Sequence, residues 1–177
     1  MPCRVPCGAC QAPGSPRSGP TPRYVEIVRP DQSRETVRVL RAIQERRDYG
    51  RVHVAVYELE AGDVVDPGAI MEAVGLEPVA EVELTLDDAR LATTEVLARD
   101  LAYRATIMPN EDAEALAASF LRLFPAPASY WTNGELLVAH AHGTSGAWRS
   151  ATEATFDSGL VVVSATRAGI LWVEDED

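Results

Sequence analysis

The stretch that decides the fold is residues 148–177, WRSATEATFDSGLVVVSATRAGILWVEDED, at the end of the sequence. Two apolar runs, 160–164 and 170–173, flank a short segment that contains Gly169. Such runs, separated by a few residues that include glycine, predict a β-hairpin with a longer loop. Both faces of each strand carry apolar side chains, so we expect the hairpin to be central in a sheet and covered on both sides.

Four acidic residues close this stretch: Glu174, Asp175, Glu176 and Asp177. Because unpaired charges are costly to bury, we expect these residues to lie at the rim of the sheet. An acidic rim could contact a basic protein surface, and Trp148 and Trp172 could anchor that contact if they share an exposed face. The alternative is a solvated chain end, with both tryptophans in the core.

Charge is distributed unevenly along the 177 residues, which carry a net charge of -11. Residues 1–51 contain ten arginines and five acidic residues, whereas residues 52–177 contain six and twenty-two. An acidic body repels nucleic acid and membrane surfaces and suits a basic partner protein, although ordinary solubility is the alternative explanation. The longest aliphatic run, 160–163, is too short to span a membrane, and no secretory signal is visible, so we expect a cytoplasmic protein.

The first 22 residues differ from the rest of the chain. They contain six of the twelve prolines, all three cysteines and no acidic residue. We expect residues 1–22 to be disordered and residues 23–177 to form a single globular domain. The spacing of Cys3, Cys7 and Cys10 resembles the cluster-binding loop of radical-SAM enzymes, but the chain is too short for the barrel of that family, so we expect no iron–sulfur cluster.

The apolar pattern predicts an α+β fold. Strands are expected at 23–29, 52–57, 79–85, 129–132, 135–142 and 153–156, and helices at 33–48, 67–74, 87–101 and 110–124. Asn133-Gly134 between two apolar runs predicts a hairpin turn, so the C-terminal strands should form an antiparallel meander. An α/β order is the alternative for the N-terminal half.

His140 and His142 are the candidate metal ligands. On a strand, residues two apart point to the same face, so both imidazoles could reach one divalent ion, with zinc the first choice. Asp157, in an expected turn with Ser158 and Gly159, could complete the site, as could Glu153 or Asp175. Two histidines on a surface or rim are the alternative, and then no cofactor is expected.

We interpret the chain as a small acidic protein-binding module without enzymatic activity. Its concrete form would be an inhibitor or immunity-type protein that neutralises a basic partner such as a nuclease toxin. The competing hypothesis is a metal-dependent hydrolase that uses the His-x-His pair. A third is a regulatory subunit whose basic helix at 33–48 contacts an acidic partner; the pattern leaves the oligomeric state open.

Overall fold

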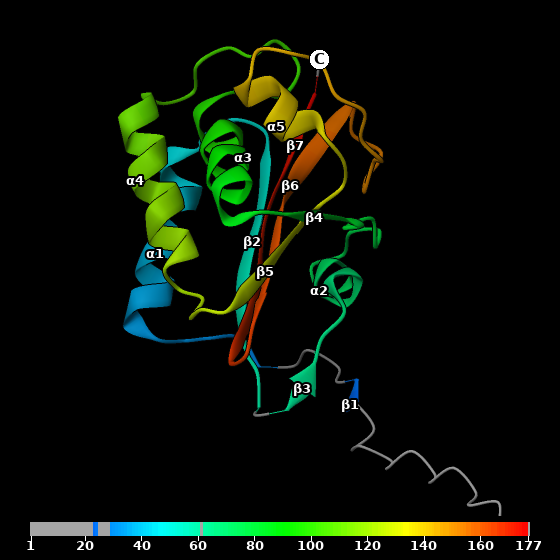
Figure 1. Cartoon of the computed structure of the whole chain (residues 1–177). Helices are drawn as coiled ribbons and strands as arrows, with labels where there is room; N and C mark the ends of the chain where they lie inside the picture. Colours follow the sequence, from blue (N-terminus) through cyan, green and yellow to red (C-terminus); the bar gives the residue numbers. More distant parts are fainter. Residues whose placement is uncertain (1–22, 25–28, 61, 177) are drawn as a thin grey trace, which may run out of the picture.

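A computed structural model describes residues 23–24, 29–60 and 62–176. A five-stranded antiparallel sheet has the strand order β2-β7-β6-β5-β4, and a separate parallel pair joins β1 to β3 (Figure 1). In chain order the elements are β1 (Arg23–Tyr24), α1 (Arg34–Arg46), β2 (Arg51–Glu58), β3 (Asp63–Val64), α2 (Pro67–Ala73), β4 (Val82–Leu84), α3 (Leu86–Ala98), α4 (Asn110–Leu121), β5 (Ala128–Thr132), α5 (Leu136–Ala141), β6 (Phe156–Ser164) and β7 (Arg167–Asp175). This arrangement confirms the α+β class.

The hairpin of β6 and β7 occupies the middle of the sheet, as predicted. Leu160 pairs with Leu171, and both strands have a neighbour on their other side. The connection is shorter than expected, since only Ala165 and Thr166 join the strands. Ser164 tightens this turn, because its hydroxyl donates to the Arg167 carbonyl at 2.9 Å and accepts from the Arg167 N–H at 3.2 Å.

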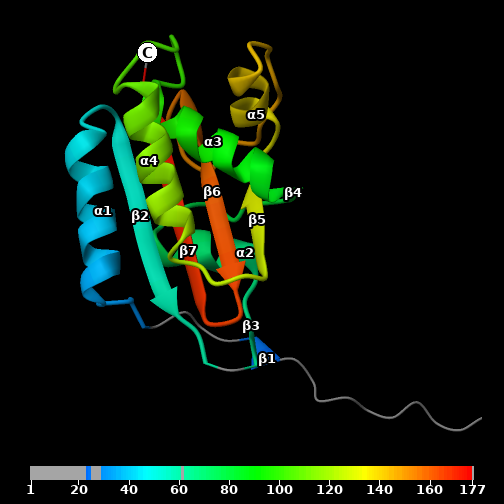
Figure 2. The same ribbon diagram turned by 60° about the vertical axis from the view of Figure 1, so that its left-hand side comes forward.

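Helices cover both faces of the hairpin. In Figure 2, α1, α4 and α3 lie on one face of the sheet, and α2 lies on the other. Leu160 and Val162 belong to the core beneath the three helices, whereas Val161 and Trp172 belong to the core on the α2 side. The apolar character of both strand faces therefore has the predicted cause, which is burial on two sides.

The helix predicted at 33–48 is α1. Its first turn is capped by Ser33, whose hydroxyl accepts from the Thr36 N–H at 3.3 Å. Thr36, Val39 and Ile43 are buried, and the exposed positions between them form the solvent side of the helix. The next strand, β2, pairs antiparallel with β7, and β4 pairs antiparallel with β5, so the main sheet does not follow the α/β alternative.

The strand predicted at 135–142 is wrong, and so is the hairpin turn before it. This segment forms the helix α5, which packs against α3 and buries Leu136 and Leu137. A short apolar run has no periodicity that separates a strand from a buried helix. Gly134 does not serve a tight hairpin turn; it bridges to Trp148, and a Cβ there would meet the Ala147 carbonyl oxygen at 2.4 Å.

Two further predictions near β6 are wrong. Residues 153–155 lie in an irregular loop, and the expected turn at 157–159 is instead the start of β6. Gly159 allows close approach of β7, because a Cβ there would lie 2.2 Å from the Leu171 carbonyl oxygen. The predicted disorder of residues 1–22 lies outside the described residues, as does most of the strand predicted at 23–29.

Within the described ranges, none of the helices is both long and apolar enough to cross a membrane.

Candidate functional site

The two histidines predicted as metal ligands do not lie on a strand. His140 is in the last turn of α5, and His142 follows as its C-cap. Positions two apart on a helix are separated by about 200° around the axis, so these imidazoles leave the helix in different directions. Among the described residues there is no group of three or more His, Cys, Asp or Glu side chains placed to hold a metal ion.

Asp157, the proposed third ligand, is fully buried on β6 and is surrounded by hydrogen-bond donors. Its carboxylate accepts from the Ala151 N–H at 3.0 Å, the Thr152 N–H at 3.0 Å and the Ser150 hydroxyl at 2.5 Å. The Trp172 indole N–H donates to the same carboxylate at 3.3 Å. Asp157 therefore fixes the loop before β6 to the sheet, which is a structural role.

Asp175 is also buried, which corrects the expectation that it lies in a solvated acidic rim. Both oxygens of its carboxylate accept from Arg47 Nη2, at 2.8 and 3.1 Å, and both side chains are fully buried. The Leu101 N–H donates to Asp175 at 2.8 Å, and Arg47 Nε donates to the Val96 carbonyl at 2.7 Å. This cluster joins α1, the end of α3 and β7.

The other residues of the predicted partner-binding set are scattered. Trp172 is fully buried, and Trp148 is half-buried and stacks on Phe156, with ring centroids 5.4 Å apart. Glu174 bonds to His53 on the neighbouring strand, and Glu176 is exposed. Asp177 lies outside the described residues. The chain end therefore presents fewer acids than the sequence indicated.

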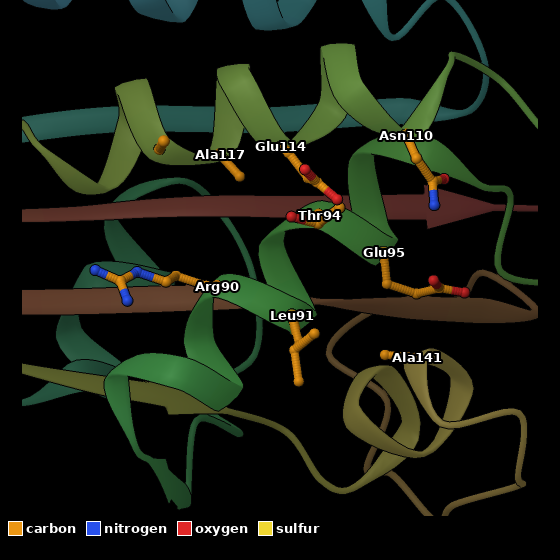
Figure 3. A pocket seen from close by; sticks show the side chains of 9 residues that line it. Arg90, Leu91, Thr94, Glu95, Asn110, Glu114, Ala117 and Ala141 are labelled. Atoms are coloured by element: carbon orange, nitrogen blue, oxygen red, sulfur yellow. The ribbon is translucent and has the colours of Figure 1, made fainter.

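A groove of about 370 Å³ lies between α3, α4 and α5, and Figure 3 shows side chains from all three helices along it. Its lining combines small apolar residues with a few polar ones: Arg90, Leu91, Thr94, Glu95, Asn110, Glu114, Ala117, Ala118 and Ala141. The small alanine side chains of α4 and α5 leave this space open between the helices.

Glu95, the buried acid of this groove, is already paired. Its Oε1 accepts from Arg104 Nη2 at 3.2 Å, and its Oε2 lies 3.8 Å from Arg99 Nε. Arg104 adopts a left-handed backbone conformation, with φ at 59°, and also donates to the His140 carbonyl. Burial, with a smaller contribution from the Arg104 charge, lowers the pKa of His140, while Glu95 opposes this shift. The group ties α3 to α5.

A second hollow, of about 280 Å³, lies where α5 meets the edge strand β4. Its apolar lining comes from Val82 and Leu84 on β4 and from Val138 and Ala139 on α5. Val82 is 37% exposed, which is high for a strand residue of this type. An exposed apolar surface with a concave shape is typical of a binding site.

Acidic residues lie in the lining of this second hollow and on the other face of the same edge strand. Asp88 and Glu135 line it, and Glu81 and Glu83 are exposed along β4 and just before it. Glu81 pairs with Arg149 at 2.6 Å in solvent, so its charge is partly offset. We define the β4–α5 surface by its apolar and acidic members: Glu81, Val82, Glu83, Leu84, Asp88, Glu135, Val138 and Ala139.

The sequence predicted a strand at 79–85, of which only Val82–Leu84 is a strand (β4), and the β4–α5 surface was missed. The alternation of Glu81 and Glu83 with apolar residues was visible, as was the apolar run 136–139. Their proximity was not, because the second run was interpreted as a strand and not as α5. Fold and surface together define an α+β protein with an apolar hollow beside the edge strand β4, and two acids, Asp88 and Glu135, belong to the lining of this hollow. Searches of family models, curated proteins and solved structures find nothing that matches this chain.

Proposed function

We propose that this chain is a non-catalytic protein-binding module that docks onto a basic partner protein through the β4–α5 surface. The observation that carries the proposal is an apolar hollow, lined by Val82, Leu84 and Val138, whose lining also contains the acids Asp88 and Glu135. The exposed acids Glu81 and Glu83 alternate with Val82 and Leu84 and therefore lie on the other face of the same edge. Protein interfaces commonly combine an apolar centre with a polar rim. An inhibitor or immunity-type protein that neutralises a basic enzyme, such as a nuclease toxin, is the concrete form.

The charge distribution supports a basic partner. Residues 52–177 contain twenty-two acidic residues and only six arginines. A field of one sign accelerates the association of an oppositely charged protein and slows that of others, more strongly at low salt. Buried acids such as Asp157 and Asp175 are matched by donors of this chain, so only the exposed acids, which include those of the β4–α5 surface, can contribute to recognition.

The test begins with gentle isolation of the protein from its own host and native mass spectrometry. We expect a basic protein at a fixed ratio. The association rate constant with the purified partner is then measured for the wild type and for the Glu83→Arg/Glu135→Arg variant. Both side chains are exposed, and neither has an ion pair among the described residues. The association rate constant should fall by about tenfold or more at low salt.

The matched control is Glu58→Arg/Glu72→Arg, which reverses two exposed acids on β2 and α2 and leaves the net charge change the same. This control should retain an association rate within about twofold of the wild type, aside from the general effect of net charge. Equal losses in both variants would mean that the β4–α5 surface is not where the partner docks. A partner that is acidic would overturn the proposal entirely.

A further inference from the structure

We infer that the partner docks by adding an extended strand to the open edge of β4. This inference rests on the proposed function and specifies the shape of the partner segment. β4 pairs with β5 through Val82, Glu83 and Leu84, and among the described strands none lies on its other side. The exposed stretch runs from Glu81 to Asp87, interrupted only by the half-buried Leu84.

The opposite edge of the sheet is not open in the same way. Residues just before α1 cover the outer side of the C-terminal end of β2, from Val56 to Glu58. The Asp31 N–H donates to the Val56 carbonyl at 2.7 Å, and the Glu58 N–H donates to the Arg29 carbonyl at 2.9 Å. Pro30 also forms a bridge with Tyr57. A partner strand that extends the sheet therefore finds unpaired main-chain groups at β4.

The side chains around β4 select the composition of the added strand. In a strand, successive side chains point to opposite faces. Val82 and Leu84 face the hollow with Val138, so every second residue of the added strand would lie over this apolar lining. The intervening residues would lie on the face of Glu83, where a cross-strand pair with arginine or lysine is favourable. The matching segment alternates apolar and basic residues.

The acids on β4 have a second consequence. Charged residues on an edge strand protect it from pairing with another copy of the same chain, since like charges would lie opposite each other. Protection of the edge strand against self-pairing does not require an apolar hollow beside it, yet a hollow of about 280 Å³ is present. The combination excludes self-pairing and admits a basic strand. Because β4 is only three residues long, an isolated peptide should bind weakly, with a Kd on the order of 100 μM.

The experiment uses the full chain and a capped nine-residue peptide of alternating arginine and valine. Amide NMR spectra follow the titration, and the largest shifts are expected at Val82, Glu83 and Leu84. Two further peptides carry N-methyl groups, one on the valines only and the other on the arginines only. Since alternate N–H groups point to opposite edges of a strand, methylation of one set should raise the Kd at least tenfold more than methylation of the other.

Equal affinities of the two methylated peptides, whether both bind or neither binds, would overturn strand addition. So would shifts that spread over the acidic surface without a maximum at β4, or the absence of binding by the parent peptide. In each of these cases the proposed function is still tested separately, because the charge-reversal variants are measured against the native partner. A dimer in sedimentation, paired through β4 and not displaced by the peptide, would also contradict the inference.

Discussion

Two groups of acidic residues in this chain have opposite environments. Asp157 and Asp175 lie on the central hairpin, are fully buried, and have their carboxylates surrounded by donors. Glu81 and Glu83, beside and on the edge strand β4, are exposed, and within the described part of the chain their side chains have one ion-pair partner, Arg149, which contacts Glu81. The residue types are nearly the same, so the difference comes from the donors that the fold brings to each position.

This contrast separates structural charge from charge available to a partner. A buried carboxylate that is bonded to donors of its own chain contributes to stability and little to the external field. An exposed carboxylate contributes little to stability and most to the field that a partner meets. The net charge of -11 counts both groups, but only the exposed acids can guide the association of a partner.

The largest effect on stability should come from Arg47→Met. This change leaves Asp175 buried without its cationic partner, at the junction of α1, α3 and β7. Removing one member of a buried ion pair costs about 3–5 kcal/mol. Urea unfolding, followed by far-UV circular dichroism, should show this loss as a lower midpoint.

The double variant Arg47→Met/Asp175→Leu should recover part of the loss, since it removes the uncompensated charge as well. The matched control is Arg51→Met, which removes an exposed arginine 3.8 Å from Glu174; we expect less than about 1 kcal/mol there. A decrease of less than about 1 kcal/mol in the free energy of unfolding of Arg47→Met would mean that Asp175 does not depend on Arg47 as a buried partner.

The second largest effect is expected for Asp157→Asn. The substituted amide keeps the shape of the side chain but replaces an acceptor oxygen by a donor that faces the Ala151 and Thr152 N–H groups. Losing hydrogen bonds to a charged acceptor costs about 1.5–3 kcal/mol. Urea midpoints at neutral pH measure the change. Exposed Glu153→Gln, in the same loop, is the control and should match the wild type.

The central hairpin could be predicted from the sequence because its features are local. The runs 160–163 and 170–173 are apolar on both faces, and burial on both sides follows from that pattern alone. Residues 135–142 could not be assigned in the same way. Their apolar run is short enough to suit a strand or a buried helix, and packing against α3 decides between the two.

Which acids are buried and which are exposed could not be predicted, because the partners of the buried acids are remote in the sequence. Arg47 and Asp175 are separated by 128 positions, and no periodicity relates them. Asp157 was expected in a turn from its neighbours Ser158 and Gly159, although Gly159 serves the close contact of two strands. The β4–α5 surface joins β4, which was predicted as the longer strand 79–85, to α5, which was predicted as a strand, so its residues appeared unrelated.

Asp31→Asn should have a smaller effect that depends on pH. Burial favours the neutral form of Asp31, but hydrogen bonds from Thr36 and Ser33 and the charge of Arg167 outweigh it and lower the pKa of this carboxyl. A lowered pKa in the folded state means that the contribution to stability is present above the unfolded value of 3.8 and is lost as the pH falls below it. At neutral pH we expect a loss of about 1–2 kcal/mol.

The measurement is the difference in urea midpoint between Asp31→Asn and the wild type, followed with pH. This difference should be constant from about pH 5 to 8 and should shrink below that range as the wild-type carboxyl is protonated. Asp63→Asn is the control, because Asp63 makes its side-chain hydrogen bond in solvent. A difference that grows as the pH falls would show that the sign of the shift is wrong.

The smallest effect should come from Glu81→Gln/Glu83→Gln, which tests the exposed side of the comparison. Neither carboxylate is buried, and the pair of Glu81 with Arg149 lies in solvent, so the free energy of unfolding should change by less than about 0.5 kcal/mol. Self-association should increase, because the edge of β4 loses the charges that oppose pairing with a second copy. Sedimentation velocity over a range of concentrations, with Glu58→Gln/Glu72→Gln as the control, measures this increase. If the β4 variant destabilises the fold by as much as Asp157→Asn does, Glu81 and Glu83 have a structural role. The distinction between buried structural carboxylates and exposed carboxylates that can meet a partner would then be wrong.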